Sequence, residues 1–118
     1  MKVAIYCKRV PDEAVVSVII LVNELMSRDV QIYMNASFSD FLKSKNISGD
    51  FIIGSSLVDV ETAPEVLISI GGDGTILDTI TAIGDSKIPI VGLNTGRLGF
   101  LANNAKEDAK QIVEMLLK

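Results

Sequence analysis

The stretch VLISIGGDGTILDTITAI, Val66 to Ile83, contains the transition that decides the fold. Its first part, as far as Ile70, is apolar except for Ser69 and rich in β-branched side chains, which predicts a buried strand. Three glycines then surround one aspartate, and a helix is predicted from Ile76 to Ile83, before Gly84. A buried strand that leads through a glycine turn into a helix is typical of a parallel sheet with helical crossovers.

The same alternation of strands and helices is expected on both sides of this stretch. Strands are predicted at Val3–Tyr6, Val30–Met34 and Ile88–Leu93, and a short strand is an option at Phe51–Ile53. Helices are predicted at Ala14–Met26, from Ser37 or Ser39 to Lys45, and at Ala105–Leu117, the last with Asn104 and Glu107 as a capping box. The first helix is apolar almost all round, so we expect it to be buried. The predicted fold class is an open three-layer α/β/α sandwich with a mainly parallel sheet.

Composition supports one domain of this class. The chain has 118 residues, of which 48 % are hydrophobic and only 5 % aromatic, so Ile, Val, Leu and Met must form most of the core. Fifteen acidic and eleven basic residues give a net charge of −4, which argues against nonspecific binding of nucleic acid. A small anionic ligand is not excluded, because backbone amides can bind phosphate on an acidic protein.

Cysteine and histidine usage excludes several chemistries. Cys7 is the single cysteine, so no intramolecular disulfide can form, and we expect it to be a small buried hydrophobic residue. The absence of histidine removes Ser-His-Asp, Cys-His and His-metal chemistry. The first apolar run is too short for a signal peptide, and the longest, Val18–Val22, is far shorter than a membrane span. The sequence predicts a cytoplasmic protein without a membrane segment.

The glycine cluster has the properties of a phosphate site. It lies at the carboxyl end of a strand, and the amino end of the following helix offers N–H groups to an anion. Asp73 needs a separate reason, because a carboxylate repels phosphate. It could bind Mg²⁺ that bridges phosphates, or act as a base toward a hydroxyl. The alternative is a tight turn in which Asp73 or Thr75 caps the helix. The GxGxxG pattern fails because Leu77 occupies the last glycine position.

A second glycine-rich stretch, GLNTGRLGF from Gly92 to Phe100, follows the next predicted strand and should therefore lie beside the first. Asn94 can hydrogen-bond a base or a ribose hydroxyl, Arg97 can bind a phosphate, and Phe100 can lie against a purine. The alternatives are a glycine turn with Asn94 in a left-handed conformation, a solvated Arg97 and a core Phe100.

The two motifs together resemble those of the NAD kinase family. Gly71-Gly72-Asp73-Gly74-Thr75 alone is shared with diacylglycerol kinases, sphingosine kinases and the phosphofructokinase superfamily. The pattern GxNxGxLGFL of Gly92–Leu101 distinguishes NAD kinases, and the resemblance covers most of the chain. It implies transfer of the terminal phosphate of ATP to the 2′-hydroxyl of NAD with a divalent metal, Mg²⁺ by analogy with the family. Polyphosphate is an alternative donor.

The resemblance also implies roles for individual residues. Asp73 would activate the ribose hydroxyl or organise the metal near it. The remaining implied positions are the phosphate-binding turn Gly71, Gly72, Gly74 and Thr75, the adenine pocket residues Leu77 and Phe100, and the motif positions Asn94, Gly96 and Arg97. Lys8 and Arg9 could meet phosphates or be ordinary surface charges. Asp78 is an extra acid that we expect to face solvent near the start of the helix.

The family pattern differs from this sequence in one large feature. Family members carry a second, β-rich domain whose Asn-Glu pair holds the ribose of NAD, whereas this sequence ends at Lys118 and its Asn23-Glu24 precedes the glycine cluster. We therefore expect an N-terminal domain that is inactive alone, with the C-terminal domain as a partner and homo-oligomerisation through exposed apolar surface. The alternatives are another GGDGT-type kinase and a non-catalytic nucleotide-binding module.

Overall fold

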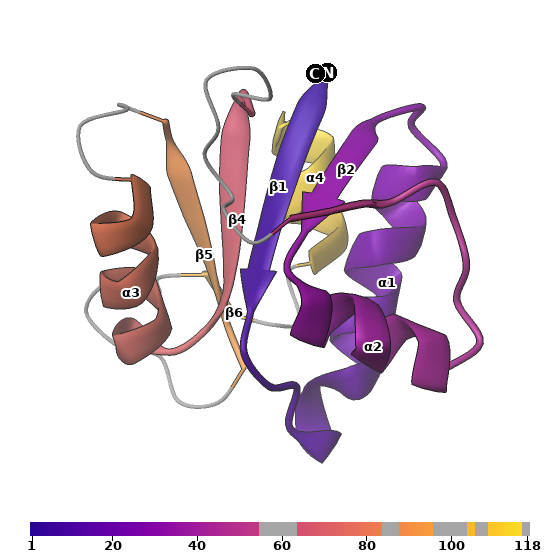
Figure 1. The fold of residues 1–118 in the computed structure, drawn as a ribbon, viewed down its shortest axis with the longest axis horizontal. Helices are drawn as coiled ribbons and strands as arrows, with labels where there is room; N and C mark the ends of the chain where they lie inside the picture. The colour runs from indigo at the N-terminus through magenta and orange to yellow at the C-terminus, as the bar shows by residue number, and fades with distance from the viewer. Residues whose placement is uncertain (55–63, 84–87, 96–103, 106–108, 117–118) are drawn as a thin grey trace.

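A computed structural model describes residues 1–54, 64–83, 88–95, 104–105 and 109–116. Within them a six-stranded sheet carries helices on both faces (Figure 1). The strands are β1 Lys2–Cys7, β2 Gln31–Met34, β3 Ile52–Ile53, β4 Val66–Gly71, β5 Ile90–Asn94 and β6 Asn104–Ala105. The helices are α1 Val15–Met26, α2 Ala36–Ser44, α3 Asp73–Ile83 and α4 Ala109–Leu116, with the 3₁₀ turn η1 Asp12–Ala14 before α1.

The sheet is parallel, and its strand order is β3-β2-β1-β4-β5-β6. In the centre, Cys7 of β1 pairs with Ile70 of β4, and Gly71 pairs with Asn94 of β5. From β1 the chain moves outward through β2 to β3, and from β4 it moves outward in the opposite direction. The strand order therefore reverses between β1 and β4, which is where open sheets of this kind form a crevice. The predicted α/β/α fold class is confirmed.

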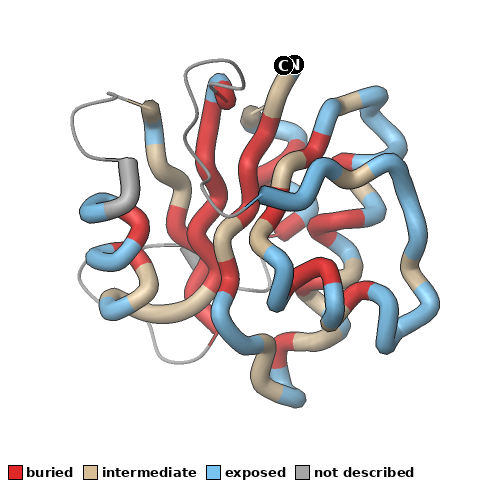
Figure 2. Tube along the Cα trace, in the orientation of Figure 1, coloured by how far each residue is buried: buried red, intermediate tan, exposed pale blue. Residues whose placement is uncertain are grey.

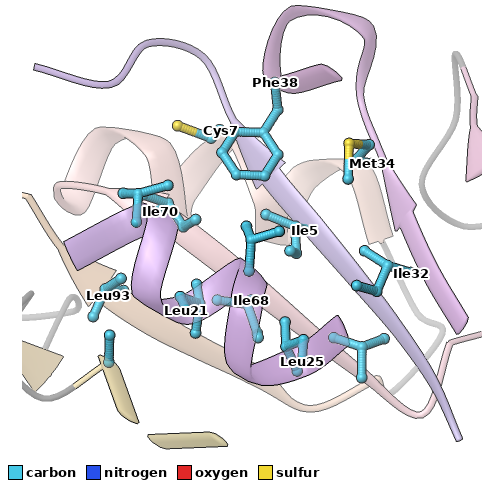
Figure 3. Packing of buried hydrophobic residues seen from close by; sticks show 14 of the residues in the cluster. Ile5, Cys7, Leu21, Leu25, Ile32, Met34, Phe38, Ile68, Ile70 and Leu93 are labelled. Carbon is cyan, nitrogen blue, oxygen red and sulfur yellow. The ribbon is translucent and has the colours of Figure 1, made fainter. Parts of the chain in front are cut away.

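The core lies between the sheet and the helices α1, α2 and α4. Alternate residues of β1 point into it, namely Val3, Ile5 and Cys7, because side chains alternate across a strand. Figure 3 shows Ile5 and Cys7 among aliphatic side chains from the neighbouring elements, with Phe38 of α2 as the aromatic member of the buried cluster. The prediction of an aliphatic core and a buried Cys7 is confirmed, since Cys7 is only 1 % exposed.

Helix α3 covers the opposite face, on the far side of the sheet from α1 and α2 (Figure 1). Its contact with β4 includes two hydroxyl groups, Ser69 Oγ and Thr79 Oγ1, which lie 3.1 Å apart and are completely buried. The Thr79 hydroxyl also donates to the Thr75 carbonyl at 2.8 Å. Since a carbonyl only accepts, the Thr79 oxygen must accept its second hydrogen bond from Ser69.

Four helix predictions need correction, the first two at the start of α3 and of α2. Helix α3 begins at Asp73, earlier than the predicted Ile76, because the Gly72 carbonyl already accepts the N–H groups of Thr75 and Ile76. Helix α2 is preceded by Asn35 as its N-cap residue, so the predicted caps Ser37 and Ser39 both lie inside the helix.

The last two corrections concern the C-terminal part and α1. Asn104 belongs to β6, beside β5, so the predicted capping box at Asn104 is wrong, and α4 is described from Ala109 onward. Helix α1 is buried on one side only, because Val16 and Ile20 are 70 % and 41 % exposed. Figure 2 shows the same division, with buried residues along the sheet and exposed ones on the outer helix faces. In the described part of the chain, no helix has the length and apolar character needed to cross a membrane.

Candidate functional site

The candidate site is the edge of the sheet where the carboxyl ends of β1, β4 and β5 meet. Because the strands are parallel, the segments that follow Cys7, Gly71 and Asn94 all begin at this edge. The first glycine motif and the start of the second are therefore neighbours, as expected from the sequence. The N–H of Thr95 donates to the Gly71 carbonyl at 3.2 Å and joins the two segments directly.

Gly71 is a glycine for reasons internal to the fold. Its φ is +152°, a conformation that residues with a Cβ rarely adopt. A Cβ built at this position would lie 2.4 Å from Thr75 Oγ1 and 2.8 Å from Thr75 Cβ. The Thr75 side chain thus occupies the space that a side chain at position 71 would need.

Gly72 and Gly74 are glycines for a different reason. Among the residues that the structure describes, no atom would lie within 4 Å of a Cβ at either position, and neither residue has a positive φ. Packing within the described chain therefore does not require glycine here. A missing side chain instead leaves the backbone at the amino end of α3 open to close approach by a ligand.

Asp73 is the first residue of α3 and is half-buried. Its carboxylate lies at the end of the helix where a negative charge is favoured by the helix dipole. Thr75 is also half-buried, with its side chain against Gly71, while Leu77 is 55 % exposed on α3. The predicted roles of these residues toward a nucleotide stay predictions.

The second motif is described only at its start. Asn94 ends β5 and is 2 % exposed, and Thr95 is 8 % exposed. Asn94 pairs with Gly71 in the sheet, so it lies beside the start of the glycine turn. Three further predicted residues, Gly96, Arg97 and Phe100, lie outside the described residues.

Asn35 is also part of this edge, and its role is not predicted from the sequence. Its side-chain oxygen accepts the Cys7 N–H at 3.2 Å, and its side-chain nitrogen donates to the Cys7 carbonyl at 2.8 Å. These two bonds tie the end of β1 to the segment after β2. An asparagine directly between a strand and a helix was the available signal. Next to it, burial raises the pKa of the Cys7 thiol to about 11, so this cysteine stays protonated near neutral pH.

Charged residues flank the reversal point between β1 and β4. Lys8, the first residue after β1, forms an ion pair with Asp78 of α3. Asp78 therefore has a cation as partner, and it lies in the second turn of α3, a turn later than expected. Arg9 lines a hollow of about 360 Å³ together with the residues of the following turn, Val10, Pro11, Asp12 and Glu13.

A larger hollow lies elsewhere and lacks these features. It has a volume of about 610 Å³ and is lined by Met1, Lys2, Met26, Asp29, Val30, Gln31, Ile32, Gly49, Asp50 and Phe51. These residues include the starts of β1 and β2, so the hollow lies at the amino edge of the sheet, away from the glycine turn. Size alone does not make it the functional site, because ligands of parallel α/β sheets bind at the carboxyl edge.

The strand order and the glycine turn at its reversal point define a doubly wound α/β protein of the kind that binds nucleotides at this edge. Comparison with known proteins gives the family. The model of the ATP-NAD kinase N-terminal domain matches residues 3–118. This chain belongs to the NAD kinase family.

Individual relatives agree with this assignment. An NAD kinase from Cytophaga hutchinsonii is 42 % identical over 95 residues, which cover 79 % of this chain and 32 % of that protein. An NAD kinase from Christiangramia forsetii is 36 % identical over 119 residues, which cover 100 % of this chain and 40 % of that protein. The chain thus spans well under half the length of these relatives. The crystal structure of yeast NADH kinase complexed with NADH matches 98 % of this chain and 35 % of its own, with a TM-score of 0.78 and 19 % identity, a likeness in fold.

Proposed function

We propose that this chain supplies the phosphate-binding half of an NAD kinase, which transfers the terminal phosphate of ATP to the adenosine-ribose 2′-hydroxyl of NAD and so forms NADP. The observation that carries the proposal is the open space in front of Gly72 and Gly74, on either side of Asp73, at the reversal point of the sheet. Membership of the NAD kinase family selects the reaction among those that such a site could support.

The residues of the turn have separate roles in this proposal. The backbone at Gly72 and Gly74 approaches phosphate oxygens, and the amino end of α3 favours their negative charge. Asp73 accepts the proton of the attacking 2′-hydroxyl, since a carboxylate held beside a bound ribose can act as a general base. Leu77, Asn94, Gly96, Arg97 and Phe100 keep the nucleotide-binding roles expected for their motif positions.

A divalent cation, Mg²⁺ in this proposal, fits the donor set in a limited way. The described residues contain no group of three or more His, Cys, Asp or Glu side chains that could hold a metal ion. Mg²⁺ needs no such group when phosphates and water supply most of its ligands, with one or two carboxylates from the protein. Asp73 is the carboxylate in the right place, and the cation would neutralise phosphate charge there.

The remaining contacts to the substrates are proposed to come from outside these residues. The match covers 40 % of the length of the relative from C. forsetii, so most of that protein has no counterpart in this chain. We propose that a further domain completes the NAD site and shields it from water, and that this chain alone is inactive. The expected homo-oligomer and the cytoplasmic location stay predictions.

Replacement of the carboxylate tests the proposed chemistry. In the full-length protein supplied with NAD, ATP and Mg²⁺, Asp73→Asn should lower kcat for NADP formation about 100-fold or more, since a general base contributes that much. The matched control is Asp50→Asn, an equal change of charge at the hollow on the opposite edge. If Asp73→Asn keeps nearly all of the control's kcat, the assignment of Asp73 is wrong, and if the wild type forms no NADP, the proposed reaction is wrong.

A further inference from the structure

The ion pair between Lys8 and Asp78 spans the reversal point of the sheet. Lys8 directly follows Cys7, which pairs with Ile70, so Lys8 leaves β1 at the level where Gly71 ends β4. Asp78 lies on α3, the helix that leaves the glycine turn. The Lys8 side chain therefore joins the end of β1 to the helix that follows β4.

The pair is accessible and exchangeable. The side chains of Lys8 and Asp78 are 59 % and 46 % exposed, so water screens their attraction. The hydrogen bond to Asp78 raises the pKa of Lys8, so Lys8 remains a cation throughout the neutral range. An exposed pair of this kind contributes little to stability, and a more highly charged partner can replace the carboxylate.

The surroundings indicate what that partner is. Gly72 and Gly74 leave open space at the amino end of α3, next to the carboxyl ends of β1 and β4. A phosphate in that space would feel the repulsion of the Asp78 carboxylate unless a cation were held between them. Lys8 is placed to be that cation, since it is a compact, mobile point charge and a common phosphate ligand.

We propose that Lys8 binds a phosphate group of the nucleotide at the glycine turn, and that Asp78 is a positioning residue that holds the Lys8 ammonium over the crevice until the phosphate displaces it. The inference rests on the proposed kinase function, because that function places a nucleotide phosphate at this turn. The phosphate belongs either to the diphosphate of NAD or to the triphosphate of ATP, two anions with the same chemistry toward Lys8.

The test compares nucleotide affinity in charge-matched variants of the full-length protein. Lys8→Met should weaken the binding of NAD or of Mg²⁺-ATP, measured separately by titration calorimetry, about tenfold, which is the effect of one lost charge-assisted hydrogen bond. Lys43→Met removes an equal charge from the last turn of α2 and should leave both affinities unchanged. Lys8→Arg should restore most of the lost affinity. The nucleotide whose affinity falls in Lys8→Met is the one whose phosphate Lys8 contacts.

Asp78 gives the second half of the test. Asp78→Asn should tighten binding of the same nucleotide a few-fold, because the phosphate no longer competes with a carboxylate for Lys8. The double variant Lys8→Met/Asp78→Asn should bind that nucleotide as weakly as Lys8→Met does. Equal affinities in Lys8→Met and Lys43→Met for both nucleotides would overturn the inference. So would an Asp78→Asn variant as weak as Lys8→Met, because the pair would then be structural. A wild type that binds neither nucleotide would remove the proposed function as well.

Discussion

The three glycines of GGDGT do not share one purpose. Gly71 is required by the chain itself, because its φ of +152° and the Thr75 side chain exclude a Cβ. Gly72 and Gly74 face open space and have no positive φ. One motif therefore combines a residue needed for folding with two that the packing of the described residues does not require to be glycine. Sequence inspection could not separate these roles, since the letters are identical.

Alanine substitutions at single positions separate them. Gly71→Ala should lower the free energy of unfolding by about 3 kcal/mol, from backbone strain together with the contact to Thr75. Gly72→Ala is the matched control and should change it by no more than about 1 kcal/mol, while weakening nucleotide binding. Urea denaturation of both variants gives the comparison. Equal losses of stability at positions 71 and 72 would contradict the steric explanation.

At the scale of elements, α3 is fixed to β4 by a buried pair of hydroxyl groups. Thr79→Val keeps the shape of the side chain but removes the acceptor of the Ser69 hydroxyl, which has no exposed surface. A buried donor without a partner costs about 1–3 kcal/mol, and the free energy of unfolding should fall by that amount. Thermal or urea unfolding measures the effect.

The same helix contains a control. Thr81 donates to the Leu77 carbonyl at 3.0 Å, as Thr79 does to Thr75, but Thr81 is exposed. Thr81→Val should therefore change stability by less than about 0.5 kcal/mol. Adding Ser69→Ala to Thr79→Val should recover part of the loss, because both partners are then apolar. A loss in Thr81→Val equal to that in Thr79→Val would show that helix propensity, and not burial, is responsible.

Elements with long apolar runs were predictable and short or polar ones were not. The runs at Val3–Tyr6 and Val66–Ile70 gave β1 and β4 nearly to the residue, because buried parallel strands are continuous in β-branched side chains. Strand β6 has two residues, Asn104 and Ala105, and exists through its pairing with β5, which no local pattern encodes. The start of α3 was placed too late because glycines disfavour helices by propensity alone.

The sequence predicts where the candidate site lies, but it does not predict the side-chain contacts within the site. The order of elements was enough to bring Gly71 and Asn94 to one edge, since carboxyl ends of parallel strands lie together. The bonds of Asn35 to Cys7 and the ion pair of Lys8 with Asp78 join elements that are distant in sequence. Such contacts depend on side-chain positions in the folded state, which the spacing of residues does not specify.

For the molecule as a whole, the buried thiol of Cys7 should lower the free energy of unfolding at alkaline pH. Its pKa is raised from 9.0 to about 11, so above pH 9 the unfolded chain releases a proton that the folded chain retains. The thiol's contribution is complete below pH 9 and is lost as the pH rises to about 11, a change on the order of 2 kcal/mol.

Comparison with Cys7→Ala isolates this contribution, because lysines and tyrosines titrate equally in both proteins. The excess stability of the wild type over Cys7→Ala should shrink by that amount between about pH 8 and about pH 11, measured by urea unfolding at each pH. An excess that stays constant over this range would mean that the thiol titrates alike in the folded and unfolded chains.

The different reasons for glycine at position 71 and at positions 72 and 74 have a consequence for how the sequence can evolve. A stable fold should require glycine at position 71 whatever the protein does, because the Thr75 side chain excludes a larger residue there. In the proposed function, glycine at positions 72 and 74 is required only while a nucleotide has to approach the backbone. A duplicated copy of this gene that lost its substrate would be free to accumulate side chains at positions 72 and 74 and would still keep the first glycine.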